Sequence, residues 1–189
     1  MTPFMNFISL FGAKGLFSII LSILLILFKK TRKVGICAIL AVGISALICN
    51  VILKSLVGRP RPYTDSAYTE WWQAVGAHTE KDASFPSGHV NNVTALIVAL
   101  FLSFGKKKYT FPMLLFPLVM CMSRIYLVVH YPSDVLFALF TGVASAFASF
   151  GATKVIYNAV DKKDNKFTNF FKNACILDLF KKNKGSDDV

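Results

Sequence analysis

The sequence predicts an all-α protein, a polytopic bundle of about five membrane-spanning helices. Of its 189 residues, 54% are hydrophobic, eighteen are phenylalanine and the mean hydropathy is +0.55. These values exceed those of an ordinary soluble domain. Short polar breaks divide the apolar residues into runs, each near the ~20 residues that span a ~30 Å hydrocarbon core. The runs are 10–28, 34–53, 89–104, 111–129 and 135–152.

The first and third runs are the least regular of the five. Lys14 lies inside the first run and is expected to extend its ammonium toward the nearer membrane surface. The third run is short unless its helix begins before His89. A cleaved signal peptide is not predicted, because the basic cluster at 29–33 follows the first apolar run instead of preceding it.

The chain divides into a helical membrane domain, residues 1–160, and a basic tail, residues 161–189. In the tail, Phe167, Phe170, Phe171 and Ala174 recur at helical spacing among lysines. This pattern predicts an amphipathic helix that lies on the cytoplasmic leaflet.

Basic residues predict the orientation, because short cytoplasmic loops retain lysine and arginine. They gather at 29–33, at 105–110 and from Lys154 onward, which alternates correctly for an outer N-terminus and a cytoplasmic C-terminus. The net charge of +11 is therefore explained mostly by the membrane topology and by attraction to anionic lipid. Nucleic-acid binding is not predicted. The four cysteines have neither metal-ligand spacing nor a disulfide pattern.

Ionisable side chains from three separate places converge on the predicted outer side of the membrane. Charged residues inside membrane-spanning helices are costly and usually mark a pathway or a site. Lysine and the arginine fork are the side chains that bind phosphate best, and a helix start with small residues adds backbone N–H groups. The predicted anion site consists of Lys54, Arg61 and Arg124 with Ser87 and Gly88 of "PSGH".

Two histidines beside this site point to chemistry as well as binding. One imidazole can attack phosphorus while the other donates a proton. Asp134 lies four residues after His130 and is placed to orient its ring, whereas His89 follows the "PSG" turn. A binding or transport protein for lipid phosphates is the alternative, but such a protein needs neither histidine.

Three motifs in this chain resemble those of the type 2 phosphatidic acid phosphatase (PAP2) superfamily. They are "KSLVGRPRP", "PSGH" and "SRIYLVVHYPSD". The resemblance implies a PAP2/haloperoxidase-like helical core and a metal-independent lipid phosphatase without a cofactor. Vanadium-dependent haloperoxidases share the three motifs, but they are soluble, and the apolar runs favour a membrane phosphatase.

The resemblance also assigns roles to residues. His130 would be the nucleophile that forms a phosphohistidine, Asp134 would orient it, and His89 would protonate the leaving oxygen and later activate water. The phosphoryl group would be bound by Lys54, Arg61, Ser87, Gly88 and Arg124.

The substrate implied is a lipid phosphate or diphosphate in the outer leaflet of a cell membrane. Undecaprenyl diphosphate, hydrolysed to undecaprenyl phosphate for cell-wall synthesis, is favoured among bacterial relatives. Phosphatidate, phosphatidylglycerol phosphate, diacylglycerol diphosphate and lipid A phosphates stay open as alternatives. Membrane members of this family commonly have six helices, and here the first is expected to be missing or reduced to the residues before Gly12.

The loop 63–85 leaves two interpretations open. Trp71 and Trp72 suit the interfacial aromatic belt, so the loop either anchors in the membrane surface or lies across the site. His78 in this loop and Arg59 before it lie outside the motifs. A supporting phosphate contact is a hypothesis for Arg59 and a weaker one for His78.

Overall fold

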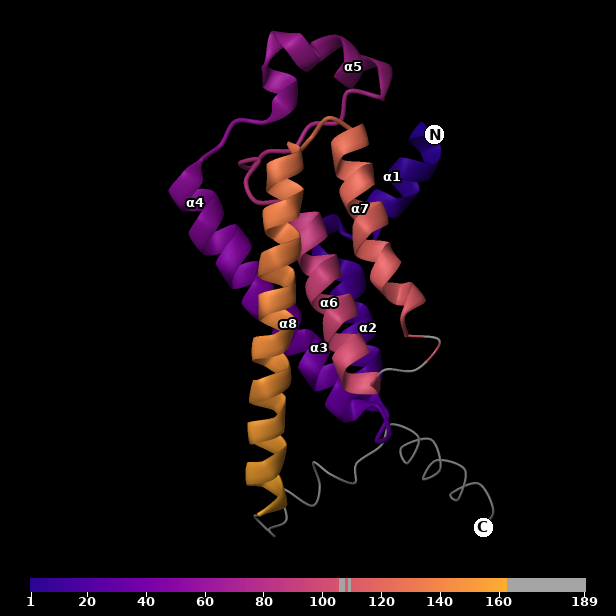
Figure 1. Cartoon of the computed structure of the whole chain (residues 1–189), viewed down its shortest axis with the longest axis vertical. Helices are drawn as coiled ribbons and strands as arrows, with labels where there is room; N and C mark the ends of the chain where they lie inside the picture. The colour runs from indigo at the N-terminus through magenta and orange to yellow at the C-terminus, as the bar shows by residue number, and fades with distance from the viewer. Residues whose placement is uncertain (106–107, 109, 163–189) are drawn as a thin grey trace, which may run out of the picture.

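The computed structural model describes residues 1–105, 108 and 110–162, and within these residues every regular element is a helix (Figure 1). The all-α prediction is confirmed. The α-helices are α1 Thr2–Leu10, α2 Leu16–Leu27, α3 Arg32–Ala46, α4 Lys54–Val57, α5 Thr69–Ala74, α6 Gly88–Phe104, α7 Leu115–Tyr126 and α8 Pro132–Asp161. A π-helical segment, Leu47–Leu53, joins α3 to α4, and 3₁₀ turns occupy Ala13–Gly15, Pro62–Thr64, Ser66–Tyr68 and Pro112–Leu114.

Three helical segments are long and apolar enough to cross a membrane: Thr2–Leu27, Arg32–Thr64 and Pro132–Asp161. The other two predicted spans correspond to shorter apolar helices, Gly88–Phe104 and Pro112–Tyr126. The prediction of one continuous helix over 10–28 is wrong, because a break at the end of α1 separates α1 from α2. Lys14 and Gly15 have positive φ angles of 50° and 68°, which a right-handed helix does not accommodate.

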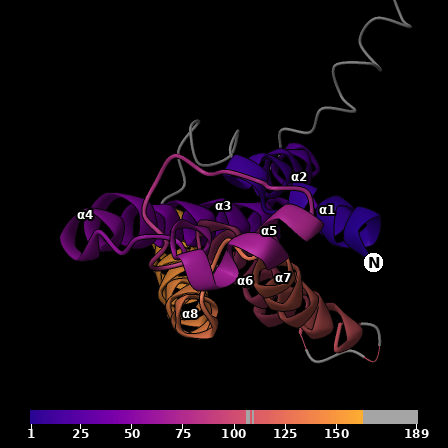
Figure 2. The ribbon, with the colours of Figure 1, turned by 90° about the horizontal axis from the view of Figure 1, so that it is seen from above.

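Helix α6 lies at the centre of the bundle, where it packs against α3, α7 and α8 (Figures 1 and 2). Its residues from Val90 to Ile97 are all buried, as expected for a helix that is surrounded on every side. Small residues allow α8 to approach it closely. A Cβ on Gly142 would lie 2.7 Å from Thr94 Cβ and 2.8 Å from the carbonyl oxygen of Asn91.

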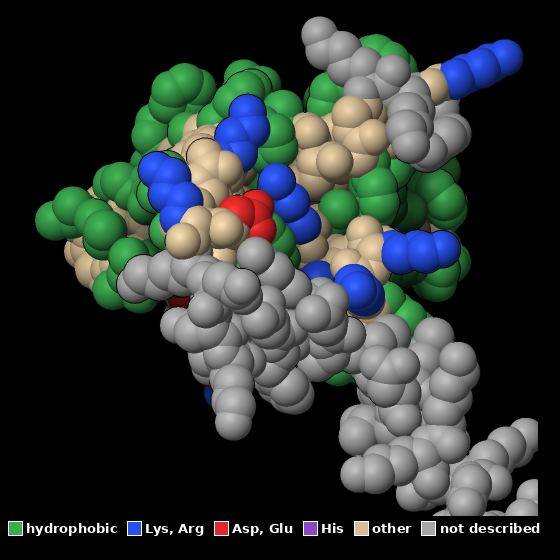
Figure 3. All heavy atoms as spheres, turned by 90° about the horizontal axis from the view of Figure 1, so that it is seen from below, with side chains coloured by type: hydrophobic (Ala, Val, Ile, Leu, Met, Phe, Trp, Pro, Cys, Tyr) green, Lys and Arg blue, Asp and Glu red, His purple; other side chains and the backbone are tan. Residues whose placement is uncertain are grey.

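The bundle has two ends that differ in structure. At the site end, α5 and the loop to α6 lie above the start of α8 and the end of α7, and α4 lies to one side (Figures 1 and 2). At the opposite end are the α2–α3 junction, the connection from α6 to α7 and the end of α8. The described members of the three predicted basic segments thus share one end, where Lys and Arg side chains are prominent (Figure 3).

The predicted amphipathic helix in the tail lies outside the described residues, which end at Lys162. The expected division at residue 160 is close to the end of α8 at Asp161. The side of the membrane that each end faces stays a prediction.

Candidate active site

A pocket of about 320 Å³ lies at the site end, among α4, α6 and the loops that follow α4 and α7. Five of the eight predicted site residues line it: Lys54, Arg61, Gly88, His89 and His130. They come from three segments that are far apart in the sequence, 54–61, 88–89 and 130. The three motifs therefore meet at one place, as the sequence predicts.

The imidazole of His130, which lines the pocket, also lies against Asp134. His130 Nδ1 is 3.6 Å from Asp134 Oδ2, and both side chains are almost fully buried. Ser84 bridges them, because its hydroxyl donates to Asp134 Oδ2 at 2.5 Å and lies 3.5 Å from His130 Nδ1. Asp134 also accepts from the Tyr131 backbone N–H at 3.0 Å and from Arg59 Nη1 at 2.8 Å. This carboxylate is held rigidly in the first turn of α8.

The partners of His130 indicate which of its nitrogens carries the proton. Arg61 Nη1 lies 3.3 Å from His130 Nε2, and a guanidinium can only donate. Nε2 therefore accepts, and the proton of the neutral ring belongs on Nδ1, toward Asp134. Burial lowers the pKa of His130 to about 4; Asp134 opposes this shift, and Arg61 and Arg124 add to it. The ring is neutral near pH 7, and the unprotonated nitrogen, Nε2, lies beside Arg61 of the pocket.

Two of the predicted phosphate-binding cations share one carboxylate partner. Asp82 forms an ion pair with Lys54 and accepts from Arg61 Nη2 at 2.5 Å. Lys54 and Arg61 are 8% and 4% exposed, whereas Asp82 is 53% exposed. Burial by itself raises the pKa of Asp82, but the two cations outweigh it and hold the pKa below its ordinary value. Asp82, which water can reach, thus holds both buried cations in place.

Arg124 and Ser87 lie next to the pocket without lining it. Arg124 Nη2 donates to Glu80 Oε1 at 2.6 Å, and Nη1 donates to Ser9 of α1. Among the described residues, Arg124 Nε and Ser87 Oγ are buried and have no hydrogen-bond partner. Unsatisfied buried donors are rare, and two of them beside a cluster of cations suit an anion that supplies acceptor oxygens.

The break between α1 and α2 forms one wall of the pocket. A Cβ on Gly12 would lie 2.7 Å from His89 Cβ, so only glycine allows this close approach. Lys14 also lines the pocket, with no acidic partner among the described residues. Lys14 is exposed, and the left-handed backbone brings it to the site; its extension toward the membrane surface stays a prediction.

The structure distinguishes between the uncertain candidates. Arg59 does not line the pocket; it pairs with Asp134 and lies 3.9 Å from the centre of the Tyr131 ring. His78 is exposed and outside the pocket. The loop 63–85 lies partly across the site, since Glu80 and Asp82 reach the pocket, while Trp71 is 66% exposed on α5.

Several residues of the site were not predicted from the sequence, among them Lys14, Glu80, Asp82 and Ser84. The glycines on either side of Lys14 are a signal for a helix break. No local pattern marks Ser84, because it lies 50 residues from Asp134 in the chain. In the described part of the chain, no group of three His, Cys, Asp or Glu side chains could hold a metal ion.

Comparison with known proteins places this geometry in context. The chain is 32% identical over 123 residues to undecaprenyl-diphosphatase BcrC of Bacillus subtilis, covering 63% of this chain and 58% of the relative. It is 31% identical to a lipid A 4'-phosphatase of Bacteroides thetaiotaomicron, covering 60% and 53%. It is 30% identical to an undecaprenyl-diphosphatase of Sulfolobus acidocaldarius, covering 77% and 67%. The chain thus spans between about half and two thirds of the length of these relatives.

Two solved structures share the fold. The crystal structure of a transmembrane PAP2 type phosphatidylglycerolphosphate phosphatase from Bacillus subtilis aligns with a TM-score of 0.64 at 26% identity, covering 82% of this chain and 77% of that one. The crystal structure of LpxE from Aquifex aeolicus aligns with a TM-score of 0.60 at 24% identity, covering 79% and 85%. The model of the PAP2 superfamily matches residues 34–157, which include all three motifs. This chain belongs to the PAP2 superfamily.

Proposed function

We propose that the protein is a membrane lipid phosphatase that acts through a phosphohistidine. The observation that carries this proposal is the arrangement around His130. Its Nδ1 faces Asp134 and its Nε2 faces the pocket beside Arg61. Binding alone does not require a buried imidazole that is oriented on one nitrogen and open to the pocket on the other.

In the first step, His130 Nε2 attacks phosphorus, and the bond from phosphorus to the leaving oxygen breaks. His89 must begin this step in its protonated form; it donates that proton to the leaving oxygen, so the dephosphorylated lipid, or the lipid monophosphate from a diphosphate, leaves with this oxygen protonated. In the second step, His89 removes a proton from water, which attacks phosphorus. The phosphorus–nitrogen bond breaks, inorganic phosphate leaves, and His130 returns to its starting state.

The cations bind the phosphoryl oxygens and stabilise the charge of the transition state. Lys54, Arg61 and Arg124 provide this charge, with Ser87 and Gly88 at the start of α6. In the structure, Asp82 and Glu80 form ion pairs with the same cations. We infer that a bound phosphate replaces these carboxylates, which lie on the loop and can move outward.

A lipid diphosphate, most simply undecaprenyl diphosphate, is the proposed substrate. A phosphoryl group at His130 uses the three buried cations, and a second phosphate needs another positive partner. Lys14 lines the same pocket and has no acidic partner in the described part of the chain. The names of two relatives, both undecaprenyl-diphosphatases, support this choice.

The proposed location is a cell membrane, with the site end outside the cytoplasm and the C-terminus inside it. The basic residues at the opposite end support this orientation. Labelling of single cysteines in intact cells tests it: residues in 63–85 are expected to react from outside, and residues in 105–110 are not.

Phosphate release by the purified full-length protein tests the function. The panel compares undecaprenyl diphosphate with phosphatidate, phosphatidylglycerol phosphate and a lipid A phosphate, each with and without EDTA. The expected result is fastest release from the diphosphate and no loss of activity with EDTA. Tight binding of these lipids without release would instead support a binding or transport protein, and rescue by Mg²⁺ after EDTA would refute the metal-free mechanism.

A further inference from the structure

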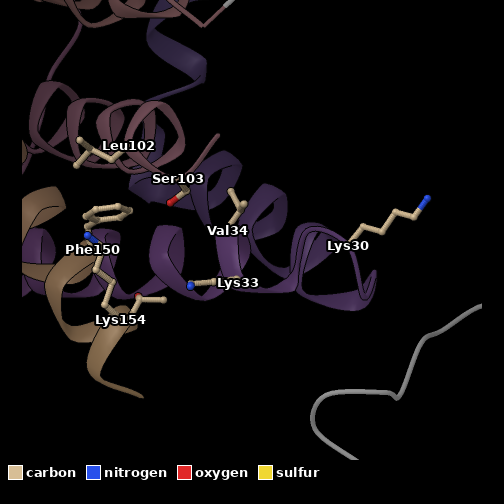
Figure 4. Close-up of a pocket in the computed structure, with 8 residues that line it drawn as sticks. Lys30, Lys33, Val34, Leu102, Ser103, Phe150 and Lys154 are labelled. Carbon is tan, nitrogen blue, oxygen red and sulfur yellow. The ribbon is translucent and has the colours of Figure 1, made fainter. Parts of the chain in front are cut away.

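A second pocket, of about 330 Å³, lies at the opposite end of the bundle, where α3, α6 and α8 meet (Figure 4). Three lysines line it, Lys30, Lys33 and Lys154, together with the hydroxyl residues Ser103 and Thr153. Phe150 and Lys154 lie 16 and 20 residues beyond Asp134 on α8, or about 24 and 30 Å at the rise of an α-helix. The pocket is therefore separate from the candidate active site.

The wall between the lysines is apolar. Val34, Leu102 and Phe150 line the pocket, and Lys154 Nζ lies 4.5 Å from the centre of the Phe150 ring. Lys33 Nζ lies 5.1 Å from the centre of the Tyr157 ring. In Figure 4, Lys33, Lys154 and Ser103 lie around the hollow, whereas the Lys30 side chain extends away from it. Cations above apolar walls match the boundary between a lipid headgroup and its acyl chains.

One side chain at this pocket has no partner within the described part of the chain. Thr153 is 1% exposed, yet its Oγ1 forms no hydrogen bond. The first turn of α3 holds Lys33 and Val34, and its N-cap, Thr31, makes no side-chain cap. The Thr31 hydroxyl donates to the Leu25 carbonyl oxygen instead, at 2.8 Å. A buried hydroxyl without a partner, beside a first helical turn that no side chain caps, favours an anion.

The lysines of the pocket also lack acidic partners. No ion pair joins Lys30, Lys33 or Lys154 to a carboxylate of the described chain. Asp161 is the one acidic residue described at this end. A phosphate would supply the negative charge that the described residues around these lysines do not.

We propose that this pocket binds the phosphate of an anionic phospholipid from the leaflet around the opposite end. Basic pockets between membrane helices bind such headgroups. The apolar walls favour a lipid over free phosphate, because only a lipid buries acyl carbons against Phe150 and Leu102. The proposal does not depend on the activity or the orientation.

Thermal unfolding of the purified full-length protein in a neutral detergent tests this site. The protein is titrated with short-chain phosphatidylglycerol, with phosphatidylcholine and with inorganic phosphate. Phosphatidylglycerol is expected to raise the unfolding temperature, and phosphatidylcholine is not. Part of any shift can arise at the active site, so the comparison between variants decides the result.

The double variant Lys33→Gln/Lys154→Gln is compared with Lys108→Gln/Lys162→Gln, which removes two lysines outside the pocket. For the first pair, the phosphatidylglycerol concentration that produces half of the maximal shift is expected to rise roughly tenfold or more. For the second pair, this concentration is expected to stay near the wild-type value. If inorganic phosphate gives the same pattern, the site is supported with free phosphate as its ligand. Equal weakening by both pairs, or by neither, overturns the proposal.

Thr153→Val provides a second, nearly isosteric test if the double variant does not fold. Without lipid it is expected to unfold at or above the wild-type temperature, because it removes an unsatisfied buried hydroxyl. With phosphatidylglycerol its stabilisation is expected to be smaller than that of the wild type. An unchanged lipid response would show that Thr153 does not contact the ligand and would contradict the proposed site.

Discussion

Both ends of the bundle collect positive charge, but the side chains are held in different ways. At the site end, Lys54, Arg61 and Arg124 are buried, and each is paired with a loop carboxylate. At the opposite end, Lys33 and Lys154 are exposed and lie against aromatic rings. A buried cation has a fixed position and a high desolvation cost, so it selects a ligand geometry. An exposed lysine changes position easily and selects mainly for charge.

The largest effect is expected when the only nucleophile proposed at the site end is removed. His130→Ala is predicted to lower phosphate release at least about 1,000-fold, since no phosphohistidine can form. Phosphate release from a lipid diphosphate measures this loss. His78→Ala, a change of the same residue type in the exposed loop, is expected to retain activity. Substantial turnover by a folded His130→Ala protein would refute the nucleophile assignment.

The second prediction compares a buried cation in a fixed position, Arg61, with an exposed one that changes position easily, Lys33. Arg61→Lys keeps the charge but loses the fork that contacts Asp82 and His130, and it is predicted to lower kcat/KM roughly 100-fold. Lys33→Arg at the opposite end is expected to leave kcat/KM unchanged. If both substitutions are tolerated equally, the two ends do not differ as described.

The motifs predicted the chemistry of the site better than its surroundings. The spacing between residues of one helix start, as in "PSGH", specifies local geometry, so Gly88 and His89 could be placed from the sequence alone. Ser84 and Asp82 act through contacts between distant segments, and a single sequence carries no signal for such contacts. Hydropathy likewise predicted the spans but not the break at Lys14, because an apolar average over about 20 residues hides one left-handed turn.

A diphosphate-specific effect is predicted for Lys14→Gln. Its ammonium is proposed to contact the second phosphate only, so KM for a lipid diphosphate should rise roughly tenfold while KM for a lipid monophosphate changes little. Steady-state kinetics on the two lipids measure the ratio. Lys14→Arg is expected to restore most of the preference. Equal changes in KM for both lipids would show that Lys14 does not determine the choice of substrate. The assignment as a phosphatase would be unaffected.

A smaller change of opposite sign is predicted for Asp82→Asn. Asp82 occupies the cations that phosphate needs, so its neutralisation is expected to strengthen inhibition by inorganic phosphate roughly three- to fivefold. The effect is modest because Asp82 is half exposed and its ion pairs are screened by water. Weaker inhibition by phosphate would show instead that Asp82 positions the cations.

The smallest effect concerns protonation of His130. Its pKa near 4 means that the ring is mostly neutral at pH 5.5, whereas an unperturbed histidine would be mostly protonated there. The folded pKa lies below the unfolded value, so protonation favours unfolding, and stability from this group falls as the pH drops from about 6.5 toward 4. NMR of labelled histidine, with the signal assigned by its loss in His130→Gln, should show no change between pH 7.5 and 5.5. A midpoint near 6.5 would mean that water reaches the ring and that the site end is not the dry, fixed environment that distinguishes it from the opposite end.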